Sequence, residues 1–114
     1  MDDRTIYTIG EAKLNKCELD ILYFVASWFP TFDRWSVSEL ADKCSLFPSD
    51  AAEAVNMLIL HGLMENAGED VLMGRMVNVP EESVRWIADH IETINSLYIM
   101  NNTDLFDDTE IAEA

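Results

Sequence analysis

Residues 49–66 read SDAAEAVNMLILHGLMEN, and this stretch decides which fold the chain is expected to adopt. Ser49 or Asp50 can cap a helix, because either side chain accepts a hydrogen bond from a free backbone N–H group of the first turn. The helix would continue to His61, where Gly62 suits the left-handed position that ends it. The run LMEN, which follows, has β character. The stretch therefore predicts a helix that leads directly into a strand.

Capping signals predict three more helices. The spacing Asn15–Glu18 is that of a capping box and begins a helix over residues 16–29. A second capping box, at residues 36–39, begins a helix that ends near Cys44. Pro80, followed by two glutamates, begins a long helix, because proline and acidic residues both favour the first turn.

The long helix after Pro80 carries an apolar seam. Its members step by three and four positions, as in a coiled coil: Val84, Ile87, Ile91, Ile94 and Tyr98. Packing against the first helix of the same chain explains this seam as well as dimerisation does, and the sequence leaves both open.

Strands are predicted on both sides of the capped helices. Residues 5–9 have β character and can add a short strand, and residues 63–66 and 71–79 form a hairpin around a turn at 66–70. The expected domains are an N-terminal segment with the short strand over 1–14, one domain with its C-terminal helix over 15–101, and an acidic tail over 102–114.

The composition excludes several classes of protein. With 114 residues, of which 49% are hydrophobic, the chain can form one domain with a sizeable core. It has no apolar stretch long enough to span a bilayer and no signal-peptide pattern at its start, so we expect a cytoplasmic protein. Its 22 acidic and 7 basic residues give a net charge of −15, which repels nucleic acid and attracts basic protein surfaces. Solubility, or a salty cytoplasm, would explain the acidity equally well.

No constellation of residues indicates catalysis. His61 and His90 are far apart in sequence, and the H-x-E at His90 lacks the P-C-x-x-C that completes a zinc-deaminase signature. Cys17 and Cys44 are isolated, which predicts two buried free thiols. We therefore expect neither an enzyme, a cofactor, a disulfide nor a metal site.

The predicted order of elements resembles a winged helix-turn-helix domain, and the most similar family is that of the MarR-type regulators. The resemblance is carried by CELDILYFVA at 17–26, by the stretch 35–64, by the hairpin with Arg75 near its tip, and by MVNVPEESVRWI at 76–87. It implies a fold that is mainly α, with a small β-hairpin wing and a long C-terminal helix. The resemblance also implies that six residues of the third helix face the DNA groove: Ser49, Asp50, Ala52, Glu53, Asn56 and Met57.

The charge of this helix departs from that family. Residues 44–74 contain no Lys or Arg and five acids, although DNA affinity comes largely from cations that neutralise phosphates. Only Arg75 offsets the acids nearby. The basic residues of the N-terminal half are either solvated surface positions or one mildly basic patch: Arg4, Lys13, Lys16, Arg34 and Lys43. We therefore do not expect direct DNA binding.

The second half of the same helix indicates an apolar surface. Residues 57–60 are all apolar, and one helix face cannot bury four consecutive residues, so Met57 and Leu60 are expected to lie outside. Exposed apolar residues beside acids make a protein-binding face, unless the C-terminal helix covers them.

These observations favour an acidic winged-helix module that docks on the basic surface of a nucleic-acid-handling protein and blocks or modulates it. An adaptor or a phage inhibitor that mimics DNA, of the anti-CRISPR or anti-restriction kind, fits this description. The alternative is a dimeric MarR-like DNA-binding transcription regulator, and a third reading is a dimerisation module. The candidate partner-binding residues are Asp50, Glu53, Asn56, Met57, Leu60, Glu69, Asp70 and Arg75.

Overall fold

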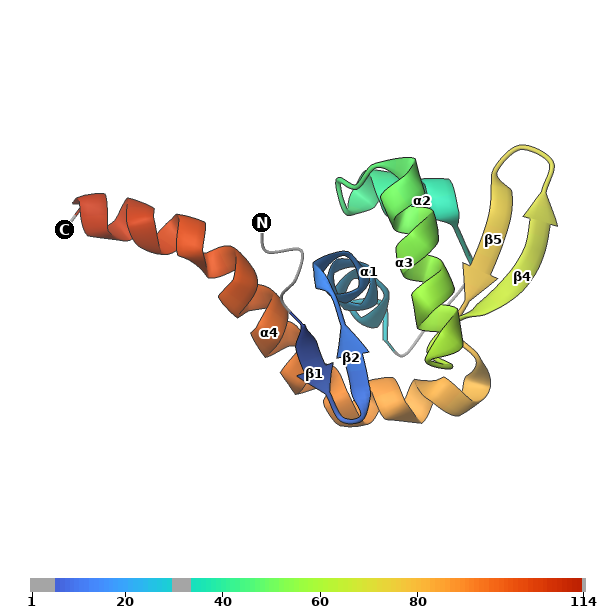
Figure 1. The fold of residues 1–114 in the computed structure, drawn as a ribbon, viewed down its shortest axis with the longest axis horizontal. Helices are drawn as coiled ribbons and strands as arrows, with labels where there is room; N and C mark the ends of the chain where they lie inside the picture. Colours follow the sequence, from blue (N-terminus) through green and yellow to red (C-terminus); the bar gives the residue numbers. More distant parts are fainter. Residues whose placement is uncertain (1–5, 30–33, 114) are drawn as a thin grey trace.

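The computed structural model describes residues 6–29 and 34–113, with side chains described as far as residue 100. Over these residues the chain forms four helices and two small antiparallel sheets (Figure 1). The elements in order are β1 (Tyr7–Ile9), β2 (Ala12–Leu14), α1 (Lys16–Ala26), β3 (Trp35–Ser36), α2 (Val37–Lys43), α3 (Pro48–Leu60), β4 (Glu65–Asp70), β5 (Gly74–Asn78) and α4 (Glu81–Glu113). The predicted winged helix-turn-helix fold with a long C-terminal helix is confirmed.

Helix α1 is the centre of the core. Its predicted capping box is present: Glu18 N donates to Asn15 Oδ1 at 2.8 Å, and Asn15 N donates to Glu18 Oε1 at 3.0 Å. α3 and α4 both pack against α1, which therefore buries residues on more than one side, as its nearly continuous apolar sequence predicts. The α-helix ends at Ala26, three residues before the predicted end, and Pro30 lies outside the described residues.

Helices α2 and α3 form the helix-turn-helix. Ser36 caps α2 by accepting the amide of Glu39 at 2.9 Å. α3 begins earlier than predicted: its N-cap is Phe47, without a side-chain cap bond, and Pro48 occupies the first turn. The prediction of a cap at residue 49 or 50 was wrong, because proline lacks an N–H group and begins a helix without needing that cap.

The wing differs from the predicted hairpin in its turn. β4 extends over Glu65–Asp70 and so includes residues 66–70, which we expected to form the turn; the chain reverses at 71–73 instead. Asp70 causes this reversal, since its Oδ1 accepts the amides of Leu72 at 2.8 Å and Met73 at 3.0 Å. The two residues of β3, which the sequence did not indicate, pair with β5 and complete a sheet of order β3-β5-β4.

The N-terminal segment forms a hairpin rather than a single strand. β1 pairs with β2 around Gly10, and the hairpin buries Ile9 and Leu14 completely. It packs against α4, where a Cβ atom on Gly10 would lie 2.9 Å from His90 Nε2.

Helix α4 packs its apolar seam within the chain. Ile87 and Ile94 are fully buried, and the ring of Tyr98 stacks on Tyr23 of α1 with centroids 3.7 Å apart. Of the two readings of the seam, packing against the first helix therefore applies to these residues. Figure 1 shows α4 passing beneath the core and then projecting from it as helix through residues 102–113, where we expected an acidic tail.

Candidate functional site

The outer face of α3 carries most of the predicted site residues. Ala51, Val55 and Leu58 point into the core, whereas Glu53, Asn56, Met57 and Leu60 are exposed. Leu60 is 76% exposed and Met57 is 37% exposed, so both lie outside. The structure therefore presents α3 as an outward-facing helix beside the wing.

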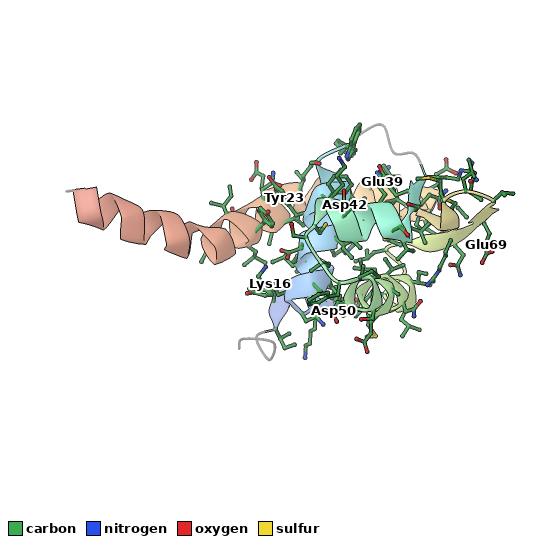
Figure 2. All side chains as sticks on the ribbon, turned by 90° about the horizontal axis from the view of Figure 1, so that it is seen from above. Lys16, Tyr23, Glu39, Asp42, Asp50 and Glu69 are labelled. Atoms are coloured by element: carbon green, nitrogen blue, oxygen red, sulfur yellow. The ribbon has the colours of Figure 1, made fainter. Side chains whose placement is uncertain are left out.

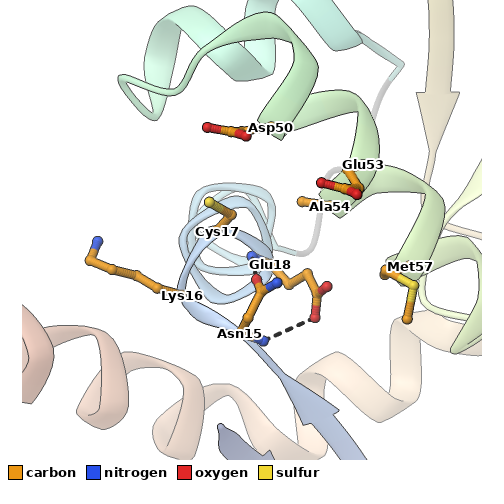
Figure 3. A pocket seen from close by; sticks show the side chains of 8 residues that line it. All are labelled: Asn15, Lys16, Cys17, Glu18, Asp50, Glu53, Ala54 and Met57. Carbon is orange, nitrogen blue, oxygen red and sulfur yellow. Dashed lines mark hydrogen bonds between the residues drawn. The ribbon is translucent and has the colours of Figure 1, made fainter. Parts of the chain in front are cut away.

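Asp50, Glu53 and Met57 share a hollow on one flank of α3. Together with the first turn of α1 they line a pocket of about 480 Å³ (Figure 3). These two carboxylates therefore do not simply project from the outer face. Asp50 in particular is only half exposed and lies on the side that faces α1.

Asn56 lies toward the other flank, where Arg75 joins α3 to the wing. Arg75 Nη2 donates to Asn56 Oδ1 at 2.8 Å, and Arg75 Nε donates to Asn66 Oδ1 of β4 at 3.1 Å. One guanidinium thus holds the helix and two strands of the wing in a defined arrangement. The sequence singled out Asn56 and Arg75 but not their contact, and it missed Asn66.

The acidic residues Asp70 and Glu69 of the wing lie close to groups of the wing itself. Asp70 Oδ1 is bonded to two backbone amides, which, with a smaller contribution from the charge of Arg34, lowers the pKa of the carboxyl below its usual value. Glu69 lies opposite Arg75 in the ladder of β4 and β5. Figure 2 shows labelled carboxylates spread over α2, α3 and the wing instead of forming one continuous row.

Basic residues reach the wing from two directions. Arg34, just before β3, donates to the carbonyl of Ala67 at 3.4 Å, next to the strand residue that Arg75 contacts. Lys16 belongs to a different region, far from Glu69 of the wing (Figure 2), and Arg4 lies outside the described residues. The single basic patch that the sequence allowed is therefore not formed by Lys16 with Arg34.

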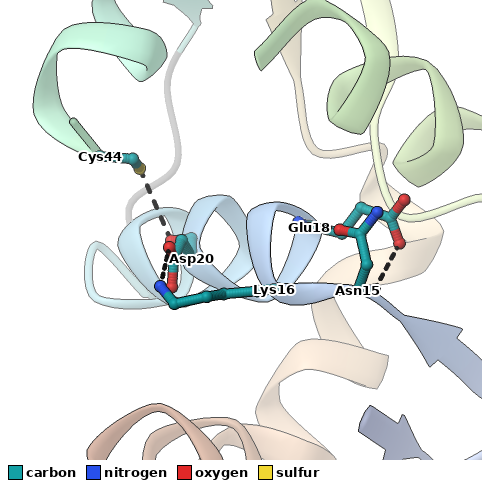
Figure 4. Close-up of polar contacts among 5 residues, drawn as sticks. All are labelled: Asn15, Lys16, Glu18, Asp20 and Cys44. Atoms are coloured by element: carbon teal, nitrogen blue, oxygen red, sulfur yellow. Dashed lines mark hydrogen bonds and ion pairs between the residues drawn. The ribbon is translucent and has the colours of Figure 1, made fainter. Parts of the chain in front are cut away.

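Lys16 instead forms an ion pair with Asp20 on α1. Lys16 Nζ lies 2.8 Å from Asp20 Oδ2, and Cys44 Sγ donates to the Asp20 carbonyl at 3.6 Å (Figure 4). Asp20 Oδ1 is buried without a hydrogen-bond partner among the described residues.

Burial changes how the groups around this ion pair titrate. It raises the pKa of Asp20, and the ion pair offsets this only in part. Partial burial alone would lower the pKa of Lys16, but the hydrogen bond and the charge of Asp20 outweigh it, so that pKa is raised too. Burial also raises the pKa of Cys44 to about 12, and both cysteines are free thiols.

The described part of the chain contains neither a metal-binding cluster nor a membrane-spanning helix. No group of three or more His, Cys, Asp or Glu side chains is arranged to hold a metal ion. No helix combines the length and apolar character that crossing a bilayer requires.

Solved structures of MarR-family regulators have a similar fold. A MarR family regulator from Neisseria meningitidis is 20% identical, with a TM-score of 0.56 over 88% of this chain and 74% of that chain. A ZitR variant from Lactococcus lactis is 15% identical, with a TM-score of 0.57 over 98% and 81%. MepR, a transcription regulator of a Staphylococcus aureus multidrug efflux pump, is 10% identical, with a TM-score of 0.54 over 89% and 66%. No family model and no curated protein matches the sequence.

These similarities correct the interpretation of function that the sequence favoured. The neighbours are transcription regulators, which contradicts a phage inhibitor or a protein-binding module that mimics DNA and supports the MarR-like alternative instead. The interpretation was wrong because the sequence gives the number of acidic residues but not their positions in the fold. Asp50 lines a hollow beside α1, Asp70 closes the turn of the wing, and Glu69 stands opposite Arg75.

Proposed function

We propose that this protein is a dimeric, DNA-binding transcription regulator of the MarR type, and not an enzyme. The observation that carries the proposal is the outward-facing helix α3, held beside the wing by Arg75, in a fold shared with MarR-family regulators over most of the chain. A helix presented in this way fits the major groove of B-DNA, which is about 12 Å wide.

The phosphate contacts would come from the wing side of α3. Arg34 lies just before β3 and Arg75 lies in β5, and both contact neighbouring positions of β4. A dimer would then offer about four such contacts, which is fewer than many DNA-binding proteins make. We therefore expect moderate affinity that depends on base contacts more than on charge.

Helix α4 supports dimerisation. Its seam buries Ile87 and Ile94 and stacks Tyr98 on Tyr23 of α1, but Ile99 and Met100, directly after Tyr98, are 55% and 66% exposed. A second copy that packed against this part would bury them and would set the distance between two copies of α3. In this proposal residues 15–101 form the winged helix-turn-helix domain with its C-terminal helix, and the acidic segment that follows continues α4 through Glu113.

Selection from a pool of random duplexes tests the proposed function. The full chain is incubated with the pool at about 50 mM salt, where electrostatic contacts are strongest, and bound DNA is sequenced over successive rounds. We expect an inverted repeat to be enriched, because a two-fold dimer reads two half-sites about 10 base pairs apart. Enrichment of no sequence, together with no retardation of any duplex at this salt, would overturn the proposal.

A further inference from the structure

The contact between Asn56 and Arg75 constrains the chemistry that α3 can present. Asn56 is exposed on α3, 19 positions from Arg75 in the sequence, and its Oδ1 accepts from Arg75 Nη2 at 2.8 Å. A guanidinium has donors only, so the amide must turn its oxygen toward Arg75. Because Asn66 accepts from Nε of the same guanidinium, the planar group is held at two points.

This arrangement leaves defined groups of Asn56 free. The Nδ2 group retains two donors, and Oδ1 retains a second lone pair. An asparagine that donates to N7 and accepts from the N6 amino group of the same base recognises adenine in the major groove. The orientation that Arg75 imposes therefore prepares the amide for this contact before DNA binds.

The neighbouring residues of α3 do not compete for this role. Glu53, one turn earlier, and Met57 line the hollow beside α1, and Leu60 offers only apolar contact. Among the residues of the outer face, Asn56 alone is tied to the wing in the described contacts.

We infer that Asn56 is a base-reading residue for an adenine in each half-site, and that Arg75 is its positioning residue. The inference rests on the proposed function and adds to it the base, adenine, whose major-groove edge α3 recognises. A purely structural role, in which the contact only attaches the wing to α3, is the opposing explanation.

Substitution of Asn56 by Asp separates these two roles. Asn56→Asp keeps an acceptor for Arg75 and so keeps the attachment, but it removes the donors and leaves a carboxylate, which accepts from the N4 amino group of cytosine. Asn66→Asp is the matched control, because it makes the same change at the other end of the guanidinium. Asn56→Ala removes the base contact without adding charge.

The experiment measures affinity for duplexes that wild type selects from a random pool, with each base pair changed in turn. Wild type should lose about 5- to 150-fold in affinity when the adenine is changed. Asn56→Ala should lose this discrimination at that position alone, and Asn56→Asp should shift it toward cytosine. Asn66→Asp should keep the preference for adenine, and all three variants should retain cooperative thermal unfolding.

The outcomes separate the inference from the function on which it rests. If wild type selects a sequence but Asn56→Ala and Asn56→Asp keep its preferences at every position, the contact is structural and the inference is wrong. If Asn66→Asp changes the preference as much as Asn56→Asp does, added charge explains the effect and the inference also fails. If wild type selects no sequence and retards no duplex, the proposed function is overturned and the inference falls with it.

Discussion

Asp20 is a buried carboxylate whose charge the fold only partly compensates. Lys16 satisfies Oδ2 at 2.8 Å, while Oδ1 has no partner among the described residues. Burial therefore raises the pKa of Asp20 above its usual value of 3.8, against the effect of Lys16. Between these two pKa values the folded protein binds more protons than the unfolded chain does. The free energy of unfolding should thus fall as the pH rises through this window.

Replacement of Asp20 by Asn should remove this pH dependence. The amide does not titrate, so the contribution of residue 20 to the fall in the free energy of unfolding above pH 3.8 disappears. At neutral pH the variant should lie within about 1 kcal/mol of wild type, because loss of the ion pair is offset by loss of a buried charge. Urea unfolding at a series of pH values measures both effects. Glu92→Gln, on the exposed side of α4, is the control, and the same pH profile in both variants would contradict the prediction.

Gly10 shows a second kind of constraint at a single residue. It has φ +61°, and a Cβ atom there would lie 2.9 Å from His90 Nε2. His90 has little freedom to move away, because its Nδ1 lies 2.8 Å from the carbonyl of Trp86 and its ring stacks on the Trp86 indole.

Gly10→Ala should therefore lower the free energy of unfolding by more than backbone strain alone. Gly62→Ala is the matched control, because Gly62 also has positive φ, +81°, but no atom lies within 4 Å of its added Cβ. We expect about 1 kcal/mol for the control and roughly 2 kcal/mol for Gly10→Ala, measured by urea unfolding. Combining Gly10→Ala with His90→Ala should recover the difference. Equal losses at both glycines would show that His90 does not crowd this position.

Among the elements, α4 has two parts with different surroundings. Its first part buries Ile87 and Ile94 in the core, whereas Ile99 and Met100, directly after the Tyr98 ring that stacks on α1, remain exposed. The sequence shows one apolar periodicity over this length and does not show where the intramolecular contact ends.

Substitutions in the two parts of α4 should affect different quantities. Ile94→Ala should lower the free energy of unfolding by about 2–4 kcal/mol through a cavity in the core, with no change in sedimentation apart from unfolding. Ile99→Asp combined with Met100→Asp should leave the fold of the protomer intact but shift sedimentation from dimer to monomer, because a charge would replace each buried contact. Monomeric wild type, or a double variant that remains dimeric, would rule out this part of α4 as the interface.

The charge of the whole molecule opposes the function that its fold supports. A net charge of −15 repels DNA, and the basic residues whose described contacts lie in the wing or between the wing and α3 are Arg34 and Arg75. Because affinity gained from phosphates appears as salt dependence, the dependence of binding on salt should reveal how few phosphates are contacted.

The logarithm of the binding constant should fall with the logarithm of salt concentration with a slope no steeper than about −4, as for four phosphate contacts per dimer. Arg34→Ala should reduce this slope by about 2, since each dimer loses two contacts. Arg85→Ala, which removes the same charge from the exposed side of α4, should leave the slope unchanged. Fluorescence anisotropy with a selected duplex at several salt concentrations measures this, and equal effects of the two substitutions would contradict a contact by Arg34.

Local signals in the sequence determined the helices and the general fold. Asn15 and Ser36 cap α1 and α2 as predicted, with the full capping box at α1 and the Ser36 cap bond at α2, because a cap involves residues only three positions apart. The apolar residues of α1 and the seam of α4 indicated burial for the same reason, since helical periodicity is a local property. The turn of the wing was misplaced because the carboxylate of Asp70 competes with β propensity over the next three residues.

Only the tertiary structure decided what lies beside α3. Arg75 reaches Asn56 across 19 positions, and Asp50 and Glu53 line a hollow together with the first turn of α1. No local pattern encodes such contacts, because they depend on how the wing and α1 pack around α3. The sequence by itself determined the amount of negative charge and the presence of the helix. Packing decided which of the acidic side chains form hydrogen bonds or ion pairs with neighbouring groups and which side chains face outward.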